Sequence, residues 1–129
     1  MKQYDLAILG GGPGGYVAAI RAAQLGLTTA IIDQDKLGGI CLNWGCIPTK
    51  ALLKNAEVLD TVKNAKNFGI NIPSYKVDFA KTIRRSRQIS ERLSKGIDFL
   101  MKKNNITHII GRGSFIAENK IEVKNGRKQ

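Results

Sequence analysis

Two cysteines stand close together in the sequence, at Cys41 and Cys46, with Leu-Asn-Trp-Gly between them. A pair at this spacing can form a disulfide when the backbone brings the two Cα atoms within about 7 Å. A bridge that closes so short a loop adds little stability, so we interpret the pair as redox-active, working through a mixed disulfide. Lys50 lies one helical turn beyond Cys46, and its positive charge would favour a thiolate. The competing interpretations are two buried free cysteines or a metal site. Zinc usually takes four ligands, and the two cysteines with the distant His108 would supply only three.

A glycine-rich turn precedes the cysteines and has the pattern G-x-G-x-x-G, formed by Gly10, Gly12 and Gly15. The first glycine permits a tight turn, the second lets a pyrophosphate approach the backbone, and the third lets a helix pack closely on a strand. Asp33 closes the next predicted strand, where its carboxylate can accept hydrogen bonds from ribose hydroxyls. The pattern therefore predicts a dinucleotide site, with NAD and FAD as equal alternatives.

The elements that position these motifs alternate between strand and helix. Residues 4–9 form a short apolar run that predicts a buried strand, residues 16–25 predict a helix, and residues 28–32 predict a second strand. A strand, a glycine turn, a helix and a strand make a βαβ unit, whose right-handed crossover makes the two strands parallel neighbours. We expect a loop over residues 34–39.

Further elements are expected after the cysteines. Pro48 suits the first turn of a helix, and a long amphipathic helix follows a loop over residues 67–76. Strands are expected at residues 106–110, 114–117 and 120–123, with a turn at 111–113. The apolar faces of the two helices are predicted from residues at helical spacing: Leu52, Ala56, Leu59 and Val62 on the first, and Phe79, Ile83, Leu93, Ile97 and Leu100 on the second.

The overall composition and charge limit which classes of function the chain can have. The 129 residues, 43% of them hydrophobic, fit one globular domain or part of one, and no apolar run approaches the length of a membrane span. The net charge of +11 raises a nucleic-acid alternative, but the aromatic residues are too few and scattered for base stacking. We expect solvated basic faces, no signal peptide and a cytoplasmic protein.

Asn125 and Gly126 predict a hairpin turn, and the strands left without partners suggest a truncated chain.

The stretch Gly-Gly-Ile-Cys-Leu-Asn-Trp-Gly-Cys-Ile-Pro-Thr-Lys at residues 38–50 resembles the redox-disulfide signature of the pyridine nucleotide-disulfide oxidoreductases. The resemblance extends over essentially the whole chain, is most specific over residues 4–59 and is loose over residues 71–103. It implies an α/β, Rossmann-like FAD-binding domain with a parallel sheet, truncated in the family's β-meander. The Leu-Asn pair, the Ile-Pro-Thr-Lys ending and the Ala-Leu-Leu that follows Lys50 resemble family members that oxidise dihydrolipoamide more than glutathione or mercuric reductases.

The resemblance also implies roles for particular residues. FAD rather than NAD would occupy the first site, with its pyrophosphate on the glycine turn, its adenosine ribose on Asp33, where the family often has Glu, and Lys50 near the reactive nitrogen of the flavin. Gly113 matches a position where the backbone meets the adenine. His108 does not match the family's catalytic histidine, and we interpret it as an ordinary strand residue. The segment expected to line the cofactor comprises Gln34, Asp35, Lys36, Leu37, Gly38, Gly39, Ile40 and Cys41.

The implied reaction passes electrons from dihydrolipoamide through Cys41 and Cys46 to FAD and then to NAD⁺. The implied partners are the lipoyl domains and the acyltransferase core of 2-oxo acid dehydrogenase complexes, and the full-length enzyme would be a homodimer. Residues 1–129 would be the N-terminal portion of the FAD-binding domain, without the NAD-binding and dimerisation domains, and are expected to be unable to turn over alone. The alternatives are a glutathione, mycothiol or mercuric reductase, an FAD-binding module without activity, or a subunit that docks the acyltransferase core.

Overall fold

The first layer of the fold is a parallel sheet of three strands, β1 (Leu6–Leu9), β2 (Thr29–Asp33) and β3 (Thr107–Ile110). The computed structural model describes residues 1–124. β2 is central and pairs in parallel with both neighbours, with Ile8 opposite Ile31 and Ile32 opposite Ile109. The predicted βαβ unit and the α/β class with a parallel sheet are therefore confirmed.

The helix that joins β1 to β2 is α1 (Pro13–Gln24). It begins earlier than the sequence predicts because Pro13 suits the first helical position, where no backbone N–H is needed. Gly26 has the positive φ of 88° that a glycine stop requires, and the Leu27 N–H caps the carbonyl of Ala22 at 3.1 Å. The turn back into β2 is thus determined locally.

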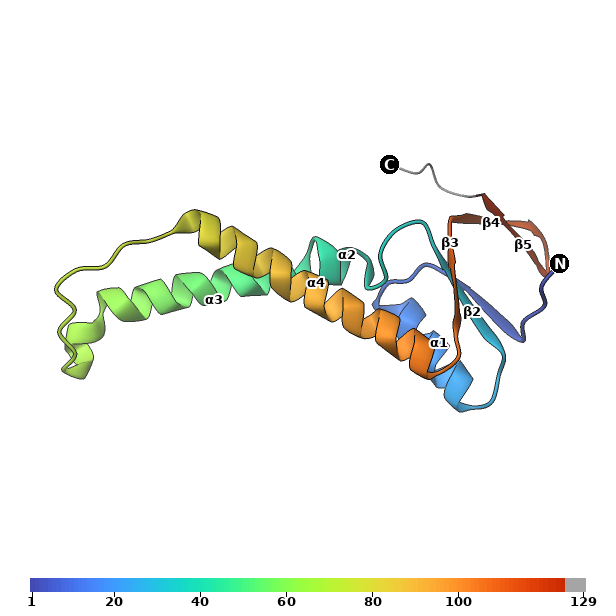
Figure 1. The fold of residues 1–129 in the computed structure, drawn as a ribbon, viewed down its shortest axis with the longest axis horizontal. Coiled ribbons are helices and arrows are strands. Elements are labelled where there is room, and N and C mark those ends of the chain that lie inside the picture. The colour runs from blue at the N-terminus through green and yellow to red at the C-terminus, as the bar shows by residue number, and fades with distance from the viewer. Residues whose placement is uncertain (125–129) are drawn as a thin grey trace.

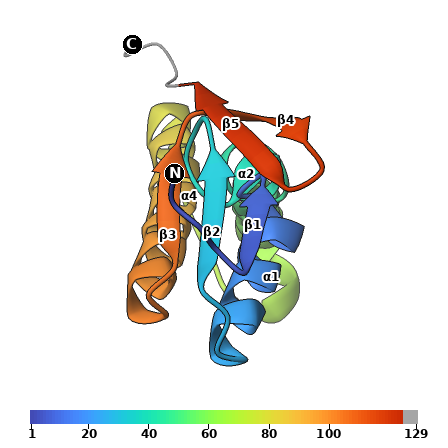
Figure 2. The same cartoon turned by 90° about the vertical axis from the view of Figure 1, so that its right-hand side faces the viewer.

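The core lies between the sheet and two helices that cover the same face, α1 and α4 (Phe79–Lys103) (Figure 2). Apolar residues of all these elements are buried there. β2 is buried almost along its whole length, as expected of the central strand with a neighbouring strand on each edge. The central cluster consists of Ala19, Ile31, Leu37, Met101 and Ile106.

A hairpin of β4 (Arg112–Ala117) and β5 (Lys120–Lys124) lies across the carboxyl ends of the parallel strands (Figure 2). Its start is joined to β2 by a hydrogen bond from the Gly111 N–H to the Asp33 carbonyl, at 2.8 Å. Arg112 and Gly113 belong to β4, so the predicted turn at residues 111–113 is too long. Only Gly111, with φ of 156°, turns the chain.

Two long helices, α3 (Cys46–Lys63) and α4, lie side by side and project from the sheet as an arm (Figure 1). The short helix α2 (Gly39–Asn43) precedes α3, and a 3₁₀ turn, η1 (Ala65–Phe68), follows it. The loop to α4 forms the far end of the arm. No helix among the described residues is long and apolar enough to cross a membrane.

The predicted apolar stripes on these helices are wrong in part. Phe79 is 70% exposed because the start of α4 lies in the arm, away from the sheet. Leu93 is 41% exposed because the neighbouring Ser90 and Ser94, and not Leu93, lie on the buried face of α4. On α3, Leu52 and Ala56 are exposed, whereas Ala51 and Pro48 are buried.

The buried face of α4 is formed by three serines at four-residue spacing together with Met101. Ser86 donates to the carbonyl of Ile83 in its own helix at 2.8 Å, whereas Ser90 Oγ has no hydrogen-bond partner among residues 1–124. The serines let α2 and α3 approach α4 closely, which a hydrophobic periodicity does not predict.

The turn predicted at Asn125 and Gly126, and a strand beginning at residue 127, lie outside the described residues.

Candidate functional site: a glycine-rich loop beside a thiol pair

The glycine-rich loop links the carboxyl end of β1 to the start of α1. Gly10 has φ of +98°, which favours glycine, and donates its N–H to the Ile32 carbonyl at 2.8 Å. A Cβ on Gly15 would lie 1.9 Å from the Gly10 carbonyl oxygen, so the helix approaches the strand as the motif requires. A Cβ on Gly12 would meet no atom within 4 Å. The structure therefore explains Gly10 and Gly15 by the fold and leaves Gly12 facing open space.

Asp33 contacts this loop directly. Its Oδ2 accepts the Gly11 N–H at 2.6 Å, and its Oδ1 accepts the Asp35 N–H at 2.9 Å. The acid at the end of β2 therefore orients the glycine loop, a role that the sequence interpretation did not assign. Each carboxylate oxygen has a further lone pair, so the side chain can still accept from a ribose hydroxyl.

The predicted cofactor-lining segment divides into two parts. Gln34, Asp35 and Lys36 are exposed, whereas Leu37 is fully buried in the core. Gly38 then donates its N–H to the Gly11 carbonyl at 2.7 Å. A Cβ on Gly39 would lie 2.7 Å from the Cα of Gly12. The structure thus packs the start of the cysteine segment against the glycine loop.

The two thiols lie on consecutive helices. Cys41, on α2, is half-buried, and Cys46, the first residue of α3, is exposed; both are free thiols in this structure. The pKa of the Cys41 thiol is raised, chiefly by a side-chain hydrogen bond with Cys46 and then by burial. Lys50 acts in the opposite direction through its charge. The two sulfur-bearing side chains are thus close enough to influence each other's protonation, as a redox pair requires.

The surroundings of the thiols are partly apolar and open. Ile40 is 76% exposed and Trp44 53% exposed, and both belong to the cysteine segment. The carbonyl of Ile40 accepts the N–H groups of Trp44 at 2.9 Å and Gly45 at 2.7 Å, which fixes the turn between α2 and α3. Exposed apolar side chains beside a thiol pair are suited to cover a flat ring system or a substrate.

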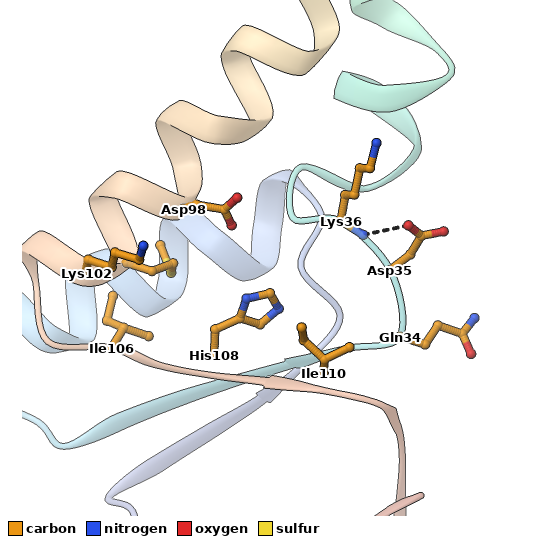
Figure 3. A pocket seen from close by; sticks show the side chains of 9 residues that line it. Gln34, Asp35, Lys36, Asp98, Lys102, Ile106, His108 and Ile110 are labelled. Carbon is orange, nitrogen blue, oxygen red and sulfur yellow. Dashed lines mark hydrogen bonds between the residues drawn. The ribbon is translucent and has the colours of Figure 1, made fainter. Parts of the chain in front are cut away.

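A pocket of about 640 Å³ opens between β3, α4 and the segment after β2 (Figure 3). The predicted residues Gln34, Asp35 and Lys36 line one side of it. His108 lies on β3 as predicted, but its side chain lines the pocket, and its Nε2 is buried without a hydrogen-bond partner among residues 1–124. Asp98 of α4 lines the same pocket (Figure 3). The cysteines, Lys50 and the glycine loop do not line it.

Gly113 has a structural explanation of its own. A Cβ there would lie 2.3 Å from Leu9 Cδ2, 3.1 Å from Ile32 Cγ2 and 3.4 Å from Ile121 Cγ2. The hairpin therefore packs on the sheet at this residue, and contact with an adenine stays a prediction.

Sequence reasoning missed the residues that hold the cysteine segment in place. Asn43 donates to the carbonyls of Leu37 and Gly39, at 3.2 and 3.0 Å. Two residues of α4 also contact the segment: Ser94 donates to the Leu37 carbonyl at 2.8 Å, and Arg87 donates to the Asn43 carbonyl at 3.4 Å. No pattern in the sequence relates the two α4 residues to a segment so far away, so only the structure reveals their contacts.

A family model of the pyridine nucleotide-disulphide oxidoreductases matches residues 4–129. The chain therefore belongs to this family of FAD-binding flavoproteins that use NAD. Among curated proteins, the chain is 53% identical to a dihydrolipoyl dehydrogenase of Rhizobium etli over 128 residues, which are 98% of this chain and 27% of that protein. It is 50% identical to the dihydrolipoyl dehydrogenase of Bacillus subtilis, over 95% of this chain and 28% of the relative.

A dihydrolipoyl dehydrogenase of Mycobacterium tuberculosis is 53% identical over 95% of this chain and 26% of the relative. The chain thus spans about a quarter of the length of the curated relatives that it matches. The recognition of the family from the cysteine signature is confirmed, as is the similarity to its dihydrolipoamide-oxidising members.

Proposed function

We propose that this chain is the FAD-binding, thiol-bearing part of a flavoprotein disulfide oxidoreductase that oxidises dihydrolipoamide to lipoamide, with NAD⁺ as final acceptor. The observation that carries the proposal is the packing of the cysteine segment on the glycine loop, through the Gly38 N–H and the Gly11 carbonyl at 2.7 Å. A dinucleotide on the loop and a disulfide at Cys41 and Cys46 would then be held by one continuous unit.

The residues present fit FAD. Gly12 has open space where a side chain would stand, and α1 has no acidic residue in its first turn to compete with a phosphate for the free N–H groups. The pyrophosphate would lie on Gly10, Gly12 and Gly15, and the ribose hydroxyls would reach the remaining lone pairs of Asp33. Residues 1–129 would then be the N-terminal portion of an FAD-binding domain.

The thiols would react as follows. A thiolate of dihydrolipoamide attacks Cys41 Sγ in the oxidised pair, which breaks the Cys41–Cys46 bond and leaves Cys46 as a thiolate. The second substrate thiolate attacks the substrate sulfur of the mixed disulfide, closing lipoamide and releasing Cys41. The positive charge of Lys50, which already favours the Cys41 thiolate, would stabilise both anions. FAD, when held by the glycine loop and Asp33, would supply the hydride chemistry toward NAD⁺.

The relatives' names extend the proposal to partners. We infer that the complete protein is a cytoplasmic homodimer that serves 2-oxo acid dehydrogenase complexes, with their lipoyl domains and acyltransferase core as partners. The support is the identity of about half the residues to dihydrolipoyl dehydrogenases along nearly all of this chain.

The test is an FAD titration of the chain followed by anaerobic addition of dihydrolipoamide, with flavin absorbance as the readout. The wild type should bind FAD and bleach on addition of the dithiol. Cys41→Ser and Cys46→Ser should bind FAD equally well but bleach more slowly by at least about a hundredfold, because each lacks half of the pair. A chain that binds no FAD, or serine variants that bleach at the wild-type rate, would contradict the proposal. Bleaching by glutathione instead of dihydrolipoamide would contradict the proposed substrate.

A further inference from the structure

The carbonyl oxygen of Leu37 is a buried acceptor shared by two side chains from distant parts of the chain. Ser94 Oγ on α4 donates to it at 2.8 Å, and Asn43 Nδ2 at the end of α2 donates at 3.2 Å. Leu37 is 0% exposed, Ser94 4% and Asn43 8%. Two donors on one buried carbonyl fix the orientation of the peptide that joins Leu37 to Gly38.

That peptide leads directly into the thiol segment. Gly38 adopts the left-handed conformation, with φ of 103°, and is bonded to the glycine loop through Gly11. Asn43 also holds the Gly39 carbonyl, at 3.0 Å. Cys41 follows on the same short helix. The direction in which α2 leaves the loop, and hence the position of Cys41 beside Cys46, depends on the Leu37 peptide.

We propose that Ser94 is a positioning residue for the thiol pair: its hydroxyl holds the Leu37 carbonyl and so fixes how Cys41 faces Cys46. Ser94 comes from a helix whose other serines make no such contact. This inference rests on the proposed function for the redox role of the thiols, whereas the hydrogen bonds stand on the structure alone.

The same helix face supplies a matched control. Ser86 is 2% exposed and donates to the Ile83 carbonyl of its own helix, so Ser86→Ala also removes one buried hydroxyl with its hydrogen bond. It removes no contact with the cysteine segment. Ser94→Thr keeps a hydroxyl at the decisive position and serves as the conservative variant.

The experiment measures the rate of iodoacetamide alkylation of Cys41 against pH in the reduced chain without FAD, with peptide mass spectrometry to separate Cys41 from Cys46. The charged and titratable groups that face the thiol are Cys46 and Lys50, and Arg87 of α4 contacts the nearby Asn43 carbonyl. In Ser94→Ala the contact between Cys41 and Cys46 should loosen. The Cys41 profile should then move to lower pH, with alkylation at neutral pH faster by about threefold.

Ser86→Ala and Ser94→Thr should keep the wild-type profile. The proposal is overturned by a folded Ser94→Ala protein with an unchanged Cys41 profile, or by an equal shift in Ser86→Ala. If Ser94→Ala does not fold, Ser94→Cys, which is nearly isosteric but a much weaker donor, should show the same shift, and an unchanged profile there also overturns the proposal. A chain that shows the shift but binds no FAD would contradict the proposed function and leave the role of Ser94 intact.

Discussion

At the scale of single residues, the glycines of the G-x-G-x-x-G loop serve different purposes although the motif treats them alike. Gly15 is required by the fold, because a Cβ would overlap the Gly10 carbonyl. Gly12 has ordinary extended backbone, with φ of −71° and ψ of −176°, and open space at its Cβ. Nothing in the folded chain therefore explains why Gly12 is a glycine, and a bound pyrophosphate would.

Alanine substitutions should separate these two roles. Gly12→Ala should change the free energy of unfolding by less than about 0.5 kcal/mol while weakening FAD binding by at least about tenfold. Gly15→Ala should destabilise the fold by about 2–4 kcal/mol, because backbone must shift. Urea unfolding and FAD titration measure the two effects.

Gly96→Ala in α4 is the control, since its Cβ also meets nothing within 4 Å. It should stabilise the helix by about 0.5–1 kcal/mol and leave FAD binding unchanged. If Gly12→Ala binds FAD as tightly as the wild type, the open space at Gly12 does not hold the pyrophosphate.

At the scale of elements, the side chain of Asp5 joins the residue before β1 to Thr28, the residue before β2. Asp5 Oδ2 accepts the Thr28 N–H at 2.8 Å and the Thr28 hydroxyl at 2.5 Å. These hydrogen bonds, the one from the hydroxyl first, lower the pKa of the Asp5 carboxyl from its ordinary value of 3.8. A pKa that is lower in the folded chain contributes stability above pH 3.8, and this contribution is lost as the pH falls through the folded-state value.

Asp5→Asn should therefore lower the melting temperature at neutral pH and flatten its decline in acid. Melting curves of both proteins from neutral pH to well below the ordinary pKa of aspartate measure the difference. Glu118→Gln, at an exposed position in the β4–β5 turn, should keep the wild-type decline. Parallel declines for wild type and Asp5→Asn would show that the contact with Thr28 contributes nothing to the acid dependence.

At the scale of the whole molecule, the net charge of +11 is spread over a small fold with a projecting arm. The ion pairs of the described residues are all exposed, such as Lys54 with Glu57 at 2.7 Å and Lys95 with Glu91 at 2.9 Å. Exposed pairs contribute little, so repulsion among the remaining cations dominates the electrostatic free energy.

The melting temperature should consequently rise when sodium chloride is increased from about 10 mM to about 150 mM, because the screening length shortens severalfold. Chloride is used rather than phosphate, which could bind the glycine loop. The double reversal Lys63→Glu with Lys66→Glu lowers the net charge and should reduce the dependence on salt. A melting temperature that falls with added salt in the wild type would mean that attractive pairs outweigh repulsion.

The sequence by itself determined those parts of the protein whose structure depends only on residues that are close together in the chain. The strand, glycine turn, helix and strand of residues 6–33 follow from residue types at short range, and so does the stop of α1 at Gly26. The cysteine signature indicated the family because the residues that the thiol chemistry needs lie in one contiguous segment, where the sequence shows them together. Over residues 71–103, where the resemblance to the family is loose, the sequence predicted only a long helix. The hydrophobic pattern of that helix does not specify which elements it packs against.

Only the tertiary structure decided which face of that helix is buried and what it holds. Ser94 meets the Leu37 carbonyl across 57 residues of sequence, and Asp33 meets the Gly11 N–H across 22. Phe79 is exposed because α4 extends beyond the sheet. Hydrogen bonds between distant segments depend on how elements pack, and a polar residue in a helix carries no local sign of its partner. The thiol pair was therefore readable from the sequence, whereas the contacts that orient it were not.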